Sequence, residues 1–184
     1  MFNFRFLNSI VIKYKLLLLV SIPLVGFLFF SVSQVYDAYK NVNIMQKIEV
    51  LSKLSKNISL VLEQLQEERS EIGIILSEKD KKAEGKLQEQ IKKSDKSIHI
   101  FRVFSKTIDY SHYSIKLKED IEFSLNELKK LNVIRNKITA KETNIKSVMK
   151  SFSKVNESLL NIVVLTAKES NNIKISQELT SYSS

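Results

Sequence analysis

Hydrophobic residues divide the chain into one continuous apolar run and a longer region with helical periodicity. The run from Leu16 to Val35 contains no charged residue, and its length matches the ~20 residues that a helix needs to cross a bilayer. Beyond it, apolar residues recur every three or four positions, which indicates amphipathic helices. The pattern predicts an N-terminal stretch over 1–15, a transmembrane helix over 16–35 and a helical region over 36–184.

Four helical stretches are expected after the N-terminal stretch, the first of them continuing from the apolar run to about Ser77. The charged segment Glu78–Gly85 is the first predicted turn, Asp109–Tyr113 is the second, and Thr139–Glu142 is the weakest boundary. The 184 residues include only three glycines and one proline, the residues that favour tight turns, which disfavours a β-rich fold. The sequence therefore predicts an all-α protein, with short connections that favour an antiparallel helical bundle.

Charge around the apolar run predicts its orientation. Arg5, Lys13 and Lys15 precede the run, and the first acidic residue is Asp37. By the positive-inside rule the N-terminus is cytoplasmic and the remainder is exported, in the periplasm of an inner-membrane protein. The alternative is a cleavable signal peptide that ends at the small residues Ser31–Ser33. We favour a retained anchor because the run is long and the helical pattern resumes soon after it.

Two charged residues interrupt an apolar stripe on the first helix. At heptad spacing the stripe holds aliphatic or small side chains in every turn except the one with Glu68 and Arg69. In the third helix, Arg135 occupies a position where the apolar series leads one to expect an aliphatic residue. A charge in a core costs several kcal/mol unless it is paired or meets a ligand. The sequence thus predicts a polar layer in the bundle, where a small ligand can bind.

Two interpretations of this polar layer stay open from the residues alone. In the first, Arg69 and Arg135 bind a small planar oxyanion, because the forked N–H donors of a guanidinium match two oxygens at once. Gln66, Glu68 and Asp95 would then lie around the ligand. In the second, Arg69 or Arg135 forms a buried ion pair with Glu68 or Asp95, which fixes the register of the helices and binds nothing.

Composition narrows the functional classes. The formal net charge of +9 favours anionic ligands or surfaces, although most of the lysines are expected on solvated helix faces. Basic and acidic residues are interspersed, which argues against nucleic acid. The absence of cysteine excludes disulfides and thiolate metal sites, and His99 and His112 lack clustered acids, so we expect no metal and no cofactor. Because no nucleophile elbow or phosphate loop occurs, an enzyme is not expected.

Several segments resemble the nitrate- and nitrite-sensing (NIT) domain of bacterial receptors. The most specific match is Leu65-Gln66 with Glu68-Arg69. Ser70 stands where the family usually has glycine, and Phe152 where a tyrosine is usual. The other matching segments are Ile72–Leu76, Gln90–Asp95, Leu128–Ile138, Ser151–Ser153, Asn156–Thr166 and Asn172–Tyr182.

The resemblance implies the extracytoplasmic sensor region of a transmembrane receptor, such as the N-terminal part of a methyl-accepting chemotaxis protein. It implies nitrate or nitrite as the ligand and a homodimer as the assembly. Because the family continues into a further helix, it also implies that the bundle is incomplete at Ser184. Two alternatives remain: a membrane-tethered helical adaptor without a small ligand, and the non-catalytic membrane half of an enzyme-linked receptor.

Overall fold

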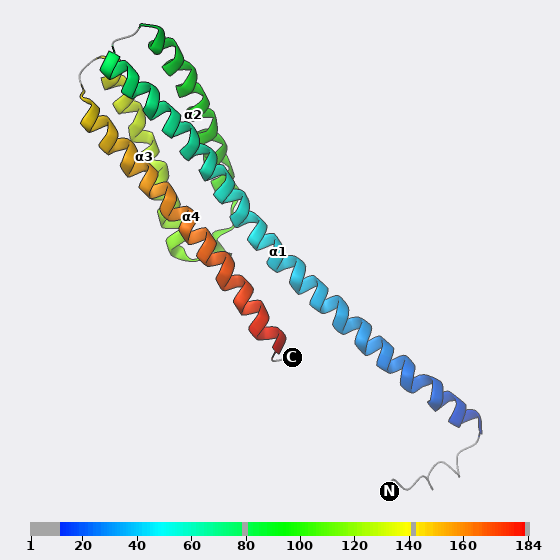
Figure 1. Cartoon of the computed structure of the whole chain (residues 1–184). Helices are drawn as coiled ribbons and strands as arrows, with labels where there is room; N and C mark the ends of the chain where they lie inside the picture. The colour runs from blue at the N-terminus through cyan, green and yellow to red at the C-terminus, as the bar shows by residue number, and fades with distance from the viewer. Residues whose placement is uncertain (1–11, 79–80, 141–142, 183–184) are drawn as a thin grey trace. The chain divides into compact units, whose positions relative to one another are not determined.

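Helices form almost all of the protein. The computed structural model describes residues 12–78, 81–140 and 143–182. They hold four α-helices and a short 3-10 helix, with no strand (Figure 1). The elements are α1 (Ile12–Glu78), α2 (Lys81–Thr107), η2 (Tyr110–His112), α3 (Ile115–Thr139) and α4 (Ile145–Tyr182). The all-α prediction is therefore confirmed.

The chain divides into two units, Met1–Met45 and Gln46–Ser184. In the first unit, the N-terminal part of α1 has apolar side chains that are mostly exposed, from Ile12 to Met45. Among the described helices, α1 is the one long and apolar enough to cross a membrane, as judged by length and composition. The apolar side chains of a membrane span face lipid and not protein. Their exposure here therefore agrees with the predicted span over 16–35.

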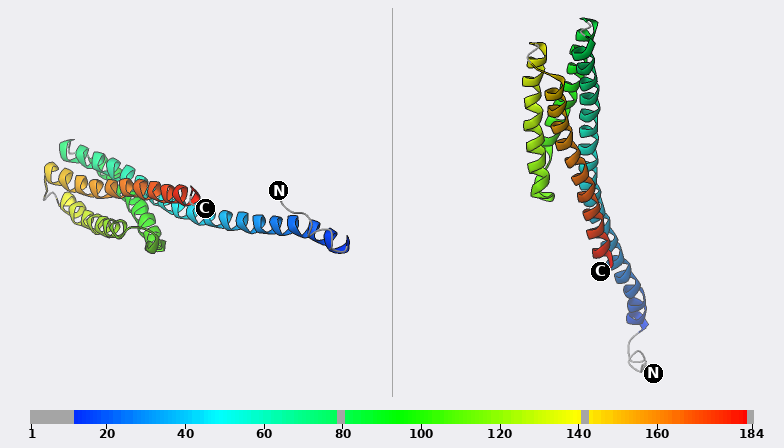
Figure 2. Two further views of the ribbon diagram at one scale, coloured as in Figure 1. Left: turned by 90° about the horizontal axis from the view of Figure 1, so that it is seen from below. Right: turned by 60° about the vertical axis from the view of Figure 1, so that its left-hand side comes forward.

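The second unit is a bundle formed by residues 46–78 of α1 together with α2, α3 and α4 (Figures 1 and 2). Consecutive helices run in opposite directions because their connections are short. The core is built from side chains at three- and four-residue spacing on each helix, as the apolar stripes predict. Its largest fully buried members are Leu51, Leu54, Ile58, Leu65, Ile72, Phe101, Leu117, Ile121, Leu131, Phe152, Leu159 and Ile162.

The connection between α2 and α3 lies where the sequence predicts it, at Asp109–Tyr113. The carboxylate of Asp109 accepts a hydrogen bond from the Ser111 amide at 3.0 Å and starts the 3-10 turn. Ser114 caps α3 by accepting from the Leu117 amide at 3.3 Å. The Tyr113 hydroxyl donates to the Lys47 carbonyl at 3.0 Å, which ties this connection to α1. These short polar side chains end one helix and begin the next.

The first predicted turn was wrong over most of its length. α1 includes Glu78, and α2 begins at Lys81, so Lys81–Gly85 are helical and not part of a turn. Lysine, alanine and glutamate are strong helix formers, so this segment is helical although it is highly charged. The predicted boundary near Thr139 is confirmed, since α3 ends at Thr139 and α4 begins at Ile145. Residues 79–80 and 141–142 lie outside the described residues.

Candidate functional site: two arginines in the bundle

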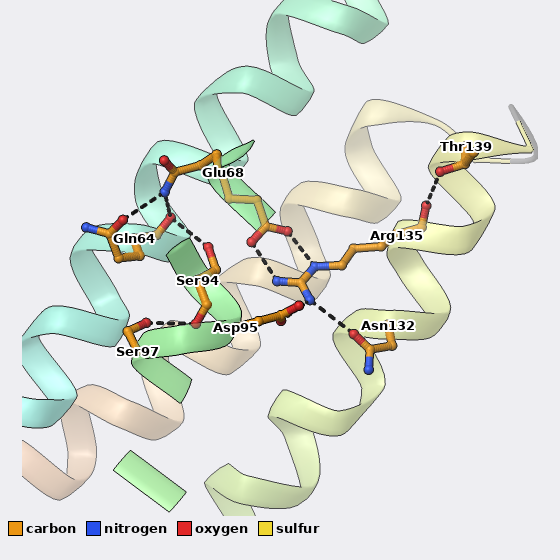
Figure 3. A network of polar contacts seen from close by, with 9 residues as sticks. Gln64, Glu68, Ser94, Asp95, Ser97, Asn132, Arg135 and Thr139 are labelled. Atoms are coloured by element: carbon orange, nitrogen blue, oxygen red, sulfur yellow. Dashed lines mark hydrogen bonds and ion pairs between the residues drawn. The ribbon is translucent and has the colours of Figure 1, made fainter. Parts of the chain in front are cut away.

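Arg135 and Glu68 form a buried ion pair between α3 and α1 (Figure 3). Nε of Arg135 donates to Oε1 of Glu68, and Nη2 donates to Oε2, both at 2.7 Å. Glu68 is fully buried and Arg135 is 7% exposed. Two parallel charge-assisted hydrogen bonds of this kind fix the orientation of both groups, so the pair sets the position of α3 against α1.

The remaining side of the Arg135 guanidinium faces α2 (Figure 3). Nη1 donates to Oδ1 of Asp95 at 2.7 Å and to Oδ1 of Asn132 at 3.0 Å. Burial by itself would lower the pKa of Arg135, but the hydrogen bonds and charges of Glu68 and Asp95 outweigh it, and the pKa is raised. Four of the five N–H groups of this guanidinium thus have protein acceptors.

A second set of polar contacts joins α1 and α2 beside this pair (Figure 3). Nε2 of Gln90 donates to the carbonyl of Gln64 at 2.9 Å and to its Oε1 at 3.1 Å. The hydroxyl of Ser94 donates to the same carbonyl at 3.2 Å. Sequence reasoning assigned no role to these contacts. Their signal was present, because the buried residues Gln90, Ser94 and Ser97 interrupt the apolar face of α2 at helical spacing.

Arg69 faces a different neighbour, although it follows Glu68 directly. The hydroxyl oxygens of Ser55 and Thr166 lie 2.6 Å apart in a hydrogen bond between α1 and α4. A Cβ placed on Gly73 would lie 3.9 Å from the Met149 side chain of α4. Ser55, Arg69 and Gly73 share one side of α1 at helical spacing, so Arg69 lies on the side that faces α4.

Arg69 differs from Arg135 in having no partner among the residues that the structure describes. It is partly buried, yet its guanidinium makes no hydrogen bond or ion pair within the described part of the chain. Gln66, three residues earlier, is exposed and likewise makes no side-chain hydrogen bond there. The structure therefore brings Glu68, Asp95 and Arg135 together, and it places Arg69 and Gln66 outside that cluster. The ligand roles of Arg69 and Arg135 stay predictions.

A further charged cluster lies between α3 and α4. The buried carboxylate of Glu127 contacts Nζ of Lys130 at 2.5 Å and Nζ of Lys154 at 3.4 Å. The hydrogen bond from Lys130, followed by that from Lys154, holds the pKa of Glu127 below its usual value although burial opposes this. An open cavity of about 360 Å³ adjoins these groups and is floored mainly by Val133, Ile134 and Val155. No group of three or more side chains that could hold a metal occurs among the described residues.

A family model described as "Nitrate and nitrite sensing" (NIT) matches residues 60–184. The chain belongs to the NIT family. The match includes the Glu68–Arg135–Asp95 cluster and Arg69, and it begins within α1 after the apolar N-terminal part. The resemblance found in the sequence is thereby confirmed, and the NIT domain is a sensor domain and not a catalytic family. No curated protein and no solved structure matches the chain significantly.

Proposed function

We propose that this NIT domain is the extracytoplasmic ligand-binding region of a bacterial receptor and binds nitrate or nitrite at Arg69. The family supports a nitrate- or nitrite-sensing role. The apolar N-terminal part of α1 supports a single span of the inner membrane, with the bundle in the periplasm. Chemotaxis as the output and a homodimer as the assembly are proposed from the family resemblance.

The observation on which this proposal rests is the unpaired guanidinium of Arg69. A partly buried charged group without an acceptor lowers stability, and an anion bound there would remove that penalty. The guanidinium fork offers two parallel donors to two oxygens of a planar anion. Gln66 lies one turn before Arg69 on α1, near enough for its amide to approach the same ligand.

Arg135 can bind an anion through two N–H groups only if one of its present acceptors is displaced. Its guanidinium keeps one N–H on Nη2 after the four protein contacts. A ligand that needs two donors has to replace Asp95 or Asn132, both of which are exposed. Exchange with Asp95 would put one anion in place of another at the guanidinium. We therefore propose Arg69 as the primary contact. Arg135 is a second contact that an anion reaches by exchange with Asp95, while Glu68 keeps it in place.

A membrane-tethered adaptor without a small ligand is the second candidate. It is favoured by the state of Arg135, whose charge is already balanced by protein carboxylates. If Arg69 were also only a surface-solvated side chain, the bundle would have no need of an anion, and its partner would be another protein.

Thermal unfolding distinguishes the two candidates. Ligand that binds only the folded state adds about 2.7 kcal/mol of stability at 100 times Kd. For a chain of this length that corresponds to a rise in Tm of about 5–10 °C. We expect this rise for the purified full chain in detergent with millimolar nitrate or nitrite, and none with equimolar chloride. An unchanged Tm with every small oxyanion would favour the adaptor.

A further inference from the structure

Asn156 on α4 is a buried polar residue whose side chain has no hydrogen-bond partner in the described part of the chain. It is 9% exposed, and its Oδ1 is fully enclosed and accepts no hydrogen bond. Its side chain makes no hydrogen bond with any described residue. Buried amides in folded proteins are nearly always paired, because an unpaired one loses its hydration without compensation. An explanation is therefore needed for this residue, because the side-chain amides of Gln64 and Gln90 in the same bundle are bonded to each other.

Contacts between α1 and α4 place Asn156 near Arg69. Ser55 is opposite Thr166, and Gly73 is opposite Met149, so the two helices are antiparallel in a fixed register. In that register Arg69 is level with residues 152–153, about one turn from Asn156, or roughly 5 Å along the axis. Asn156 follows Met149 by seven residues and so lies on nearly the same, α1-facing side of α4.

The two side chains converge because of the direction in which helical side chains lean. In a helix, each Cα–Cβ bond tilts toward the N-terminus of its own helix. Since α1 and α4 are antiparallel, Arg69 leans toward the level of Asn156, and Asn156 leans toward the level of Arg69. They nevertheless form no hydrogen bond with each other, so a guanidinium without an acceptor and an amide without a partner face the same interface.

We propose that Asn156 completes the Arg69 site and makes it selective for nitrate over nitrite. This inference rests on the proposed function, in which Arg69 binds a planar oxyanion. The guanidinium of Arg69 donates hydrogen bonds to two oxygens of the anion. The carboxamide of Asn156, which can turn to present its N–H donors, binds the third oxygen of nitrate. Nitrite lacks the third oxygen and presents only its nitrogen lone pair on that side, which lies farther from the amide. Sites built to pair a polar group discriminate against ligands that lack the matching group.

The test is titration calorimetry of the full chain in detergent with sodium nitrate and sodium nitrite. Asn156→Leu removes the amide with little change in volume. We expect it to weaken nitrate binding about tenfold or more while nitrite affinity changes less than about twofold. Asn156→Asp places a carboxylate beside the anion and should weaken both ligands strongly. Asn161→Leu, an exposed position on the same helix, is the matched control and should change neither.

Stability of the ligand-free protein gives an independent readout. Because Asn156→Leu removes an unpaired buried amide, we expect its Tm to rise by about 2–4 °C, which also shows that the variant folds. Equal loss of nitrate and nitrite affinity in folded Asn156→Leu, or no loss of either, would overturn the inference while leaving Arg69 as the anion site. Binding of neither anion by the unmodified chain would overturn the proposed function as well.

Discussion

Arg135 and Arg69 are two arginines of one bundle with opposite environments. Arg135 is buried, and four of its five N–H groups meet carboxylate or amide oxygens. Arg69 is partly buried and meets no protein acceptor within the described residues. A buried charge with complete pairing positions helices, whereas a partly buried charge without pairing is available to a ligand. We propose that this difference separates a structural role for Arg135 from a binding role for Arg69 within one polar layer.

The geometry of α1 produces this difference. Successive residues on a helix point about 100° apart. Glu68 therefore faces α2 and α3, where it meets Arg135, while Arg69 faces α4. On the α1-facing side of α4, about one turn from the level of Arg69, lies Asn156, whose buried Oδ1 has no partner among the described residues. One turn of α1 thus holds both a closed ion pair and the residue that we propose as the anion contact.

The largest effect is expected from removing one member of the closed pair. Arg135→Met leaves Glu68 charged and buried, and we expect a loss of about 3–5 kcal/mol in the free energy of unfolding. Arg135→Met combined with Glu68→Leu should recover most of that loss, because no isolated charge remains. Chemical denaturation measures both, with Lys137→Met on the exposed face of α3 as the control. A single variant as stable as the control would mean that the pair does not hold the helices together.

A smaller effect on stability is expected at Asp95, the exposed member of the cluster with Glu68 and Arg135. Asp95→Asn removes one carboxylate from Arg135, and since its side chain is 55% exposed, the loss of stability should be within about 1 kcal/mol. If an anion reaches Arg135 by exchange with Asp95, the variant should bind nitrate more tightly than the unmodified chain. Asp120→Asn, which affects only a surface pair with Lys116, is the control. Weaker nitrate binding by Asp95→Asn would contradict the exchange.

The smallest effect on stability is expected at Glu127, a buried carboxylate that is paired with two lysines. Its pKa is lowered in the folded state, so its contribution to stability is present above the unfolded pKa and is lost as the pH falls through the folded value. Glu127→Gln should therefore be less stable than the unmodified chain at pH 7, and the gap should shrink as the pH falls below about 4.5. Urea denaturation across pH 3–7 measures the gap, with exposed Glu119→Gln as the reference. A gap independent of pH would show that the lysine contacts do not stabilise the fold.

Periodicity predicted the fold well because the core of a bundle follows directly from three- and four-residue spacing. The interruption of that spacing at Glu68 and Arg135 also marked the polar layer, and the ion pair was one of the two interpretations. The sequence could not show which arginine would be paired, because a heptad pattern does not say which helix lies opposite each face. The predicted turn at Glu78–Gly85 is misplaced because the helix propensity of Lys81–Gly85 outweighs the high charge of that segment.

Asn156 shows a different limit of sequence reasoning. Heptad spacing puts Asn156 in line with Met149 and Val163, beside the apolar stripe of α4, but it does not show whether the amide has a hydrogen-bond partner. Its burial follows from how α4 packs against α1, which is fixed by contacts such as Ser55 with Thr166. Polar residues whose significance depends on having no partner can be recognised only after all the helices are in place.

The nitrate affinity of Arg69→Lys, compared with that of the unmodified chain, tests the central claim most directly. Lysine keeps the charge and loses the planar fork, so we expect nitrate binding to weaken about 10–100-fold with less than about 1 kcal/mol change in unfolding free energy. Arg102→Lys is the matched control, since Arg102 is a partly buried arginine on α2, outside the site that we propose between α1 and α4; the nitrate affinity of this variant should be unchanged. Undiminished nitrate binding by folded Arg69→Lys would contradict the assignment of Arg69 as the anion site.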